Sequence, residues 1–444
     1  MNHPFDRYAE FTDLPLLLEM SGKPLRKSLR VNTLKSSIEA FLQWGKEKNW
    51  QLQPVPWCPE AFFVDREDRT EALGKDLLHL LGHTYMQEAA SMLPPALLNP
   101  QPGETVLDMS AAPGSKTTQM SSMMQGRGVI IANDVQEKRL WTLKSALHRS
   151  GVTNTIVTRK VGQWFAKQMT ERFDRVLCDA PCTAQGTARK DSDALEYCSM
   201  ENIGKMAKLQ RELLTAAVHA AKIGGTIVYS TCTLTPEENE DVVRSILNNF
   251  SDQLEIINPL EILPNAGLEQ AVEDSLLLQR KVYPNTPALP MVRLWPQTLD
   301  TEGFFSAVLR KKAPTLHREH YDAVRFQEEE LPMIRRKEWE NYLVSEYGTS
   351  FMQEGERLFE RGELLLLTSN EVAAFRMPVQ DIYKFTEEGD DRRIVAGRIA
   401  TGTIKTGDEI VFLPSGKKNR IKSVEYFNGS ARKDAYAGQS IGFT

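Results

Sequence analysis

Cysteine is scarce in this sequence, with five residues among 444. Because the cysteines are scattered and odd in number, they do not form the disulfide framework of a small extracellular domain, and we expect free thiols in a reducing cytoplasm. The sequence contains no C-x-x-C pair, and its seven histidines do not lie near the cysteines at ligand spacing. These absences argue against a zinc site, and we expect no metal cofactor.

Long apolar runs are missing as well. No run reaches the roughly 18 residues of a membrane-spanning helix, and the N-terminus has no basic segment followed by an apolar core, so we expect neither a membrane anchor nor a signal peptide. The phosphate-loop pattern G-x-x-x-x-G-K-[ST] does not occur, which argues against an NTPase. The net charge is −5, so a nucleic-acid site would have to be a local basic patch.

The composition is that of an ordinary globular protein, with 41% hydrophobic and 25% charged residues. A length of 444 residues suggests about three domains. From residue 104, short apolar strands alternate with helical segments, a pattern typical of a buried parallel sheet with crossover helices. We expect strands at 104–109, 128–134, 174–182 and 224–232, and helices at 136–149 and 203–222.

This alternation predicts an α/β fold with a doubly wound, Rossmann-like sheet, and the patterns on either side of it differ. The first residues mix helical and strand-like stretches and indicate a small α+β region. Residues 316–345 are charged and look helical, 357–378 look like short strands, and the short strands and Gly and Asp turns after 376 are typical of a small β-barrel. We therefore divide the chain into 1–75, 76–312, 313–374 and 375–444.

Two stretches are locally basic although the whole chain is acidic. Residues 23–48, which include Arg30, carry seven Lys and Arg against two Glu; residues 280–318, which include Arg293, Lys311 and Arg318, carry seven against two acids. Positive charge with aromatic residues nearby suits phosphate contact and base stacking in RNA. The alternative is a solvated face over core aromatics. The aromatic residues are Phe41, Trp44, Trp50, Tyr283 and Trp295.

The segment LDMSAAPGSKTTQM (107–120) lies where an expected strand passes into a helix. Its residues Ala111, Ala112 and Gly114 are small enough for the backbone to approach a ligand, and the helix that begins near Ser115 would point its N–H groups at that ligand. Asp134 ends the next strand, where an acid can accept hydrogen bonds from ribose hydroxyls. Together these features suggest an adenosine-containing cofactor, either a dinucleotide or S-adenosylmethionine; the alternatives are a tight turn and a surface acid.

Two cysteines follow the ends of expected strands. Cys182 comes after DAP, just past the third strand, and Cys232 comes after ST, just past the fourth. Because ligands of open α/β sheets bind beyond the carboxyl ends of the strands, we expect both thiols at the edge that holds the cofactor loop. The alternative is that each is a small buried hydrophobe. That is our interpretation of Cys178 and Cys198, and Cys58 looks like a loop or packing residue.

Six segments, in order, resemble the Sun-type RNA (cytosine-5) methyltransferases, a family that uses S-adenosylmethionine. The resemblance covers about residues 20–312, and the stretches KPLRKSLRVNTLK and PVPWCPEAFFV are most similar to the bacterial branch that modifies small-subunit ribosomal RNA. The six segments are RVNTLK (from Arg30), MQEAASMLP (86–94), DMSAAPGSKTTQ (108–119), DAPCTAQGTARK (179–190), STCTLTPEENE (230–240) and RLWPQTLDTEGFF (293–305).

The resemblance implies a chemistry for these residues. Carbon 5 of cytosine is a poor nucleophile, but a thiolate that adds to carbon 6 turns the ring into an enamine whose carbon 5 can accept a methyl group. Cys232 would be that nucleophile and Cys182 the cysteine that helps to release the product, an order that spacing alone does not give. Asp179 would hydrogen-bond the cytosine edge, and Lys116 would orient the substrate or tune the nearby thiol.

The resemblance also implies a cofactor site and a partner. One position departs from the family pattern, since Val161 stands where an acid usually contacts the adenine amino group. The target base must leave its stack to reach such a site. We expect a cytoplasmic protein that acts on RNA, with ribosomal RNA favoured over transfer RNA. The implied cofactor-binding residues are Ser110, Ala111, Ala112, Pro113, Gly114, Ser115, Lys116, Asp134, Arg139 and Asp179.

The end of the chain follows a different pattern. Residues 318–370 resemble the RNA-binding tail that often follows this catalytic domain, and 375–444 resemble part of the second β-barrel domain of translation-factor GTPases, closest to that of the sulfate adenylyltransferase large subunit. This barrel would bind RNA, bind a partner or have no role of its own. Two other functions stay open: an RNA-binding protein with a vestigial methyltransferase fold, and a sulfate-activation component, against which the missing phosphate loop argues.

Overall fold

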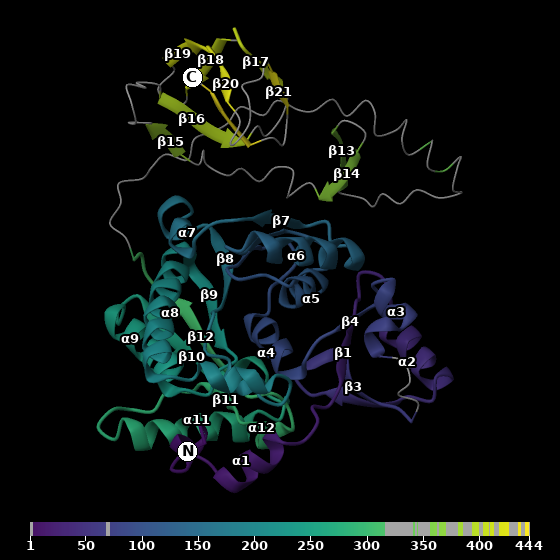
Figure 1. Cartoon of the computed structure of the whole chain (residues 1–444), viewed down its shortest axis with the longest axis vertical. Coiled ribbons are helices and arrows are strands. Elements are labelled where there is room, and N and C mark those ends of the chain that lie inside the picture. Colours follow the sequence, from purple (N-terminus) through teal and green to yellow (C-terminus); the bar gives the residue numbers. More distant parts are fainter. Residues whose placement is uncertain are drawn as a thin grey trace. The chain divides into compact units, whose positions relative to one another are not determined.

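The computed structural model describes residues 3–67 and 72–315, together with short segments between residues 341 and 443. Contacts divide the chain into two compact units, Met1–His317 and Arg318–Thr444, and each is described here by itself. In the first unit, a large sheet is flanked by helices, and a smaller sheet built from N-terminal residues lies beside it (Figure 1). None of the helices that the structure describes combines the length and apolar character needed to span a bilayer.

The smaller sheet is antiparallel, in the order β2-β3-β1-β4. Its inner face packs on helix α2 (Ile38–Glu47), where Leu29, Val31 and Phe41 share a buried cluster. Because β4 pairs with β1, this sheet extends to Met86, beyond the predicted boundary at residue 75. Its strands and the accompanying elements are β1 (Ser28–Val31), β2 (Gln51–Val55), β3 (Cys58–Asp65), β4 (Thr84–Met86), η2 (Leu73–Lys75) and α3 (Leu77–Leu80). The first elements of the chain, η1 (Asp6–Tyr8) and α1 (Leu14–Ser21), pack instead with α12 (Pro296–Leu299) and Trp295.

The large sheet has the order β10-β12-β9-β8-β5-β6-β7, with β11 paired to β12. From β5 the chain runs outward to β6 and β7 on one side, and then returns to build β8 and β9 on the other, so the order reverses between β5 and β8. Such a switch point opens a crevice at the carboxyl ends of the strands. The strands are β5 (Thr105–Asp108), β6 (Val129–Asn133), β7 (Thr155–Thr158), β8 (Phe173–Asp179), β9 (Ala221–Thr231), β10 (Leu254–Ile257), β11 (Val292–Leu294) and β12 (Phe304–Lys311).

The parallel part of this sheet matches the sequence pattern. The four predicted strands correspond to β5, β6, β8 and β9, and the pairs β5–β6, β5–β8, β6–β7 and β8–β9 are parallel. Their apolar residues, such as Leu107, Ile131 and Leu177, are fully buried because helices cover both faces of the sheet. The Rossmann-like prediction is therefore confirmed. The sequence pattern did not identify the antiparallel side, where β12 pairs with β9, β10 and β11.

Helices connect the parallel strands. The predicted helices at 136–149 and 203–222 correspond to α6 and α8, and α8 begins where the Ser199 side chain accepts a hydrogen bond from the Asn202 N–H. The helices and short turns of this part are α4 (Ala89–Leu98), α5 (Ser115–Met123), α6 (Glu137–Ser150), α7 (Gly162–Gln168), η3 (Gln185–Thr187), η4 (Ser192–Tyr197), α8 (Met200–Ala220), η5 (Pro236–Glu238), α9 (Glu240–Asn249), α10 (Pro259–Ile262), α11 (Glu269–Val282) and α12 (Pro296–Leu299).

The second unit contains the short strands expected near the end of the chain. β13 pairs with β14, and the later strands form small antiparallel sheets. The helical prediction for 316–345 falls outside the described residues, apart from Asn341 and Val344, which are helical. The described strands are β13 (Glu356–Arg361), β14 (Leu364–Ser369), β15 (Asp381–Lys384), β16 (Arg393–Arg398), β17 (Thr403–Lys405), β18 (Glu409–Phe412), β19 (Lys417–Arg420), β20 (Val424–Glu425), β21 (Asp434–Tyr436) and β22 (Ser440–Phe443).

Several residues of the two basic stretches are buried. Arg30 is 2% exposed and donates to Gln87 Oε1 at 3.1 Å and to Thr118 Oγ1 at 2.9 Å, so it joins β1 to α5. Arg293 is fully buried against Glu240. Lys311 is also fully buried; it donates to the Ala221 carbonyl and pairs with Glu171.

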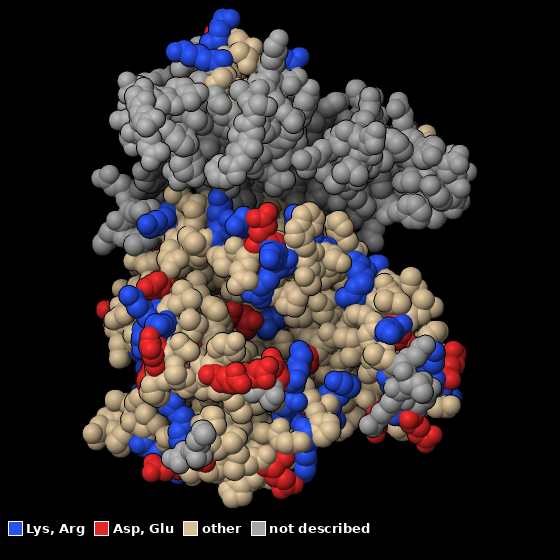
Figure 2. Space-filling view, in the orientation of Figure 1, with Lys and Arg blue, Asp and Glu red and all other residues tan. Residues whose placement is uncertain are grey.

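Two aromatic residues of these stretches, Phe41 and Trp295, lie in the core. The prediction that the two stretches contact RNA is therefore wrong for Phe41, Trp295 and the three buried cations, because tertiary packing uses them instead. Arg318 lies outside the described residues. On the face of the first unit shown in Figure 2, Lys and Arg side chains are interspersed with Asp and Glu.

Candidate active site

Four loops leave the carboxyl ends of the parallel strands around the switch point. The loop after β5 consists of residues 109–114. The loops after β6, β8 and β9 contain Asp134, Cys182 and Cys232 respectively. Lys116 lies in the first turn of α5, and Arg139 lies in the first turn of α6. The fold thus brings the predicted site residues to one edge of the sheet, although they are spread over more than 120 residues of sequence.

The loop after β5 turns sharply into α5 at Gly114. This residue has a φ of +109°, and a Cβ there would lie 3.1 Å from Leu143 and Ala146 of α6, so both the backbone and the packing require glycine. Ala111 donates its N–H to the Asn133 carbonyl at 2.7 Å, which ties the loop to β6. The first N–H groups of α5 have no acceptor within the helix, and they are therefore available to an anionic ligand group.

Asp134 is 2% exposed, which rules out the surface-acid interpretation. Its Oδ1 accepts a hydrogen bond from the Gln136 N–H at 2.9 Å. Its Oδ2 lies 3.2 Å from Arg139 Nη1 in an ion pair but accepts no hydrogen bond from the described residues. Arg139 also donates to the Ala112 carbonyl, so it connects the loop after β5 to Asp134. Asp134 therefore keeps an open acceptor at the position where ribose hydroxyls bind in such sheets.

Val161 follows β7 and caps the N-terminus of α7 without a side-chain hydrogen bond. Its side chain is 61% exposed. An acid at this position would thus be free of steric conflict, and it would in addition supply the missing cap.

Lys116 and Asp179 face each other across the switch point. Lys116 Nζ lies 2.8 Å from Asp179 Oδ2, and Ser230 Oγ donates to Asp179 Oδ1 at 2.7 Å. Burial alone would lower the pKa of the Lys116 ammonium, but the attraction of Asp179, Cys232 and Asp108 outweighs burial and raises this pKa above its ordinary value. Lys116 is therefore a fixed positive charge, and its ammonium lies 5.6 Å from the centre of the Phe304 ring.

The two predicted catalytic cysteines meet. Cys182 Sγ lies 3.3 Å from Cys232 Sγ, although the residues are separated by fifty positions in sequence. The hydrogen bond between them, together with burial and the charges nearby, raises the pKa of the Cys182 thiol well above its ordinary value. Either sulfur atom can donate in this contact, so the geometry brings the two thiols together without assigning their roles.

The other cysteines are packing residues or lie apart from the site. Cys178 is 1% exposed inside β8, and burial raises the pKa of its thiol. Cys58 begins β3 in the main core cluster, where burial raises the pKa of its thiol to about 12. Cys198 is partly exposed at the end of η4, so it is less buried than its predicted packing role implies.

Sequence reasoning missed several residues that shape the site. Ser230, Glu238 and Phe304 all lie inside quoted motifs, yet no role was assigned to them. Two glycines also contribute: the Gly186 N–H donates to the Cys232 carbonyl, and the Gly303 N–H donates to the Gly186 carbonyl, both at 2.9 Å. A Cβ on Gly186 would lie 2.1 Å from the Gly303 oxygen. Three loops therefore touch backbone to backbone beside the cysteines.

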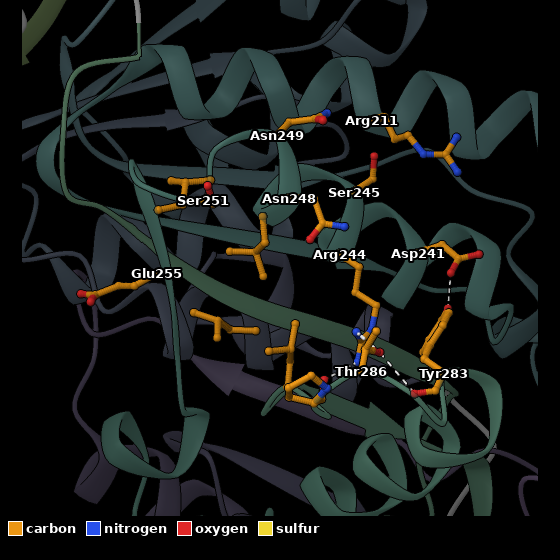
Figure 3. Close-up of a pocket in the computed structure, with 15 residues that line it drawn as sticks. Arg211, Asp241, Arg244, Ser245, Asn248, Asn249, Ser251, Glu255, Tyr283 and Thr286 are labelled. Carbon is orange, nitrogen blue, oxygen red and sulfur yellow. Dashed lines mark hydrogen bonds between the residues drawn. The ribbon is translucent and has the colours of Figure 1, made fainter.

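A separate open groove of about 930 Å³ lies between α9, β10 and the segment after α11. Figure 3 shows Arg244 at its centre, bonded to Thr286, with Asp241 bonded to Tyr283 beside it. None of the predicted site residues lines this groove. The chemistry of the cysteines therefore belongs to the strand-end edge and not to this groove.

The strand-end residues fit S-adenosylmethionine. The open Oδ2 of Asp134 suits a ribose hydroxyl, and the free N–H groups at the start of α5 suit a carboxylate. Asp108 adds a second carboxylate oxygen without a hydrogen-bond partner in the described part of the chain, since only its Oδ2 is bonded, to Thr117. Over the same described residues, no group of three or more His, Cys, Asp or Glu is arranged to hold a metal ion.

Comparison with protein families identifies the chain. Residues 95–310 match the family described as 16S rRNA methyltransferase RsmB/F, and residues 8–89 match the N-terminal domain of 16S rRNA methyltransferase RsmF. A solved structure titled as a methyltransferase homolog protein from Pyrococcus horikoshii is 35% identical, with a TM-score of 0.56, and the match covers 69% of this chain and 93% of the other. The chain belongs to the RsmB/F family. The Sun-type resemblance is thereby confirmed.

Curated RsmB/F relatives agree with this assignment. The ribosomal RNA small subunit methyltransferase F of Pectobacterium atrosepticum is 42% identical over 335 residues, which are 72% of this chain and 66% of the relative. That of Pectobacterium carotovorum is 40% identical over 339 residues, 73% of this chain and 67% of the relative. Over the other curated relatives the chain spans 58–61% of their length, so it matches less than two thirds of most of them. Residues 392–444 match elongation factor Tu domain 2 instead, in agreement with the predicted barrel.

Proposed function

We propose that this protein transfers a methyl group from S-adenosylmethionine to carbon 5 of a cytosine in 16S ribosomal RNA. The observation that carries the proposal is the 3.3 Å approach of Cys182 and Cys232 beside the Lys116–Asp179 pair, at the edge where the cofactor loop ends. Two thiols in contact at a strand-end crevice suit covalent attack on a base far better than they suit packing. Membership of the RsmB/F family supports the substrate.

In this mechanism Cys232 is the nucleophile. Its sulfur adds to carbon 6 of the cytosine and leaves electron density at carbon 5. Asp179, held by Lys116 and Ser230, accepts a hydrogen bond from the cytosine edge, and Lys116 adds positive charge beside the attacking sulfur. Carbon 5 then takes up the methyl group and releases its proton to a base, and the electron pair left behind restores the ring double bond as the bond between Cys232 and carbon 6 breaks. Cys182, still protonated, stabilises the departing thiolate by donating a hydrogen bond to it.

The cofactor would be held by the loops after β5 and β6. S-adenosylmethionine, when bound, supplies an electrophilic methyl group. The N–H groups in the first turn of α5, which begins at Ser115, would hold its carboxylate. Asp134 would accept from its ribose hydroxyls, with Arg139 fixing the Asp134 side chain. Val161, after β7, would leave the adenine amino group without the acid that the family usually provides.

We also propose where the protein acts and how its regions share the work. Ribosomal RNA is favoured over transfer RNA because both matched domains bear the 16S rRNA name, and a reducing cytoplasm suits the free thiols. In the division proposed from the sequence, 1–75 and 313–374 contact RNA, 76–312 carries the reaction, and 375–444 forms a partial barrel.

The test is transfer of labelled methyl to RNA. Wild type should label 16S rRNA, offered naked and in the small subunit, and bisulfite sequencing should place the label on a cytosine. Cys232→Ala should lose activity by about a thousandfold or more because it lacks the nucleophile. Cys198→Ala, which removes a thiol outside the site, is the matched control and should stay active. Label on transfer RNA alone would refute the substrate, and no label on any RNA would refute the activity.

A further inference from the structure

A buried carboxylate joins the two loops that carry the cysteines. Glu238, at the end of η5, is completely buried. Its Oε2 accepts hydrogen bonds from the Thr183 N–H at 3.0 Å and from Gln210 Nε2 at 2.8 Å. Its Oε1 accepts from the Thr183 hydroxyl and from Thr235 Oγ1 at 3.0 Å. These donors are neutral groups, so hydrogen bonds, and not an ion pair, hold this carboxylate in the interior.

Two of the threonines that contact this carboxylate come directly after the cysteines. Thr183 comes immediately after Cys182, and Thr233 comes immediately after Cys232. Thr233 Oγ1 lies 3.3 Å from Glu238 Oε1 and 3.0 Å from Thr183 Oγ1, so the three groups form one connected network. A shift of either loop would break bonds to a buried charge, which costs far more than breaking an exposed contact. The network therefore restricts the separation of the two sulfur atoms.

Charged groups lie near both sulfur atoms. The Lys116 ammonium interacts with Cys232, and the Glu238 carboxylate, which accepts from the N–H of the residue after Cys182, interacts with Cys182. A negative charge near a thiol favours its protonated form, and this contributes to the raised pKa of Cys182. The arrangement thus distinguishes two chemically identical side chains.

We propose that Glu238 is a positioning residue that fixes the distance between Cys182 and Cys232, and that its carboxylate, bonded to the N–H of the residue after Cys182, favours the protonated form of that thiol. This inference rests on the proposed function, because the reaction needs one attacking sulfur and one proton-bearing sulfur. Glu238 touches no reacting atom and acts only through the threonines and its charge. Its neighbour Glu237 lies in the same turn, is partly exposed and pairs with Arg7, so it provides a matched control.

The first test needs neither RNA nor cofactor. Each cysteine is alkylated with iodoacetamide between pH 6 and 10 and quantified by peptide mass spectrometry. Glu238→Gln keeps the hydrogen bonds, since the threonine hydroxyls can turn to accept from its amide, but it removes the charge. Its Cys182 profile should move to lower pH by about one unit, whereas Glu237→Gln should match wild type. An unchanged Cys182 profile in Glu238→Gln would overturn the charge part of the proposal.

The second test measures the distance restraint. Diamide oxidises the two thiols to a disulfide and is itself reduced to the hydrazine, and the rate reports how often the sulfur atoms meet. Glu238→Ala should slow disulfide formation about tenfold, and Glu238→Gln should stay close to wild type. If Glu238→Ala does not fold, Thr183→Val, which loses only the hydroxyl, decides the question with the same expected direction. A rate equal to that of wild type in the folded variant would refute the positioning role.

Methyl transfer then separates this inference from the proposed function. In an active enzyme, Glu238→Ala or Thr183→Val should lower kcat about tenfold or more while KM for S-adenosylmethionine stays within about twofold, and Glu238→Gln should recover part of the loss. Unchanged kcat in these variants, with active wild type, would refute positioning alone. If the thiols respond as expected but wild type transfers no methyl group, the proposed function is refuted, and with it the catalytic role of Glu238.

Discussion

The two halves of the candidate site are built in opposite ways. On the cofactor side, Asp134 and Asp108 each keep a buried oxygen without a hydrogen bond from the described residues, and the start of α5 offers free N–H groups. On the cysteine side, the polar atoms are bonded to one another: Asp179 to Lys116 and Ser230, and Glu238 to its threonines. The carboxylates on the cofactor side thus keep oxygen atoms that a ligand can bind, whereas both oxygen atoms of Asp179 and of Glu238 already have partners.

The largest effect on the cysteine side is expected when Cys182 is removed. Cys182→Ala should lower turnover by about a hundredfold or more, because the departing Cys232 thiolate loses its hydrogen-bond donor. Product release should then stall, and a covalent protein–RNA adduct should appear as a shifted band on a denaturing gel. Cys198→Ala should give neither effect. An active Cys182→Ala enzyme without adduct would show that the roles of the two cysteines are assigned wrongly.

On the cofactor side, the open acceptor of Asp134 should matter for binding and not for folding. Asp134→Asn keeps Oδ1 as the acceptor for the Gln136 N–H and should weaken S-adenosylmethionine binding about tenfold to a hundredfold in calorimetry, since it replaces a charged acceptor. The melting temperature without cofactor should fall only slightly, because the ion pair that is lost is with Arg139, whose side chain is 46% exposed. Glu137→Gln, an exposed acid paired with Arg159, is the control. Equal affinities would remove Asp134 from the cofactor site.

Asp108, on the cofactor side, makes the stability of the protein depend on pH. Burial raises the pKa of its carboxyl to about 7, from an ordinary value of 3.8. The folded protein therefore keeps a proton that the unfolded chain releases between about pH 4 and 7, so stability falls as the pH rises through that window and then levels off. Glu88, whose pKa burial and Glu302 raise to about 7, acts in the same direction.

Replacing Asp108 should therefore flatten the pH dependence of stability. In Asp108→Asn the free energy of unfolding, followed by the melting temperature, should fall less steeply between pH 5 and 7 than in wild type. The slopes of the two free-energy curves should differ by at most about 1.4 kcal/mol for each pH unit. The hydrogen bond from Thr117 can persist because the amide oxygen still accepts. Glu201→Gln, on the exposed side of α8, is the matched control. Parallel curves for Asp108→Asn and wild type would mean that Asp108 is ionised in the folded state.

The smallest expected effect is a gain on the cofactor side. Val161→Asp should tighten S-adenosylmethionine binding about tenfold, by supplying a hydrogen-bond acceptor for the adenine amino group. The same substitution caps α7 and so stabilises the protein without cofactor. Val161→Ser caps the helix but carries no charge, and it separates the two effects. Unchanged affinity of Val161→Asp in calorimetry would refute the proposed position of the adenine.

Sequence reasoning succeeded where a local pattern determines the outcome. Apolar strands that end at Asp108, Asp134, Cys182 and Cys232 predicted the parallel sheet and the edge at which these residues gather. It failed where burial depends on distant parts of the chain. Arg30 and Arg293 are as basic in sequence as any surface cation, yet each is enclosed by elements far away in sequence, Arg30 against Thr118 and Arg293 against Glu240.

The acidic run after Cys232 shows the same limit within five residues. Glu237 pairs with Arg7, Glu238 lies between the cysteine loops, Glu240 neutralises Arg293, and Asp241 accepts from Tyr283. In sequence these acids are alike. Only the change from the η5 turn to helix α9 sends each side chain in a different direction, and no composition or spacing rule distinguishes them.

The backbone contact between Gly186 and Gly303 limits how the sequence of this protein can vary. Any side chain at Gly186 would collide with the Gly303 and Cys232 carbonyl groups, and one at Gly303 would collide with Leu234 and Gly186. In a saturation-mutagenesis library selected for methylation, both codons should therefore remain glycine, whereas neighbouring exposed positions diversify. A variant with a new target specificity would therefore have to change other residues and keep Gly186 and Gly303.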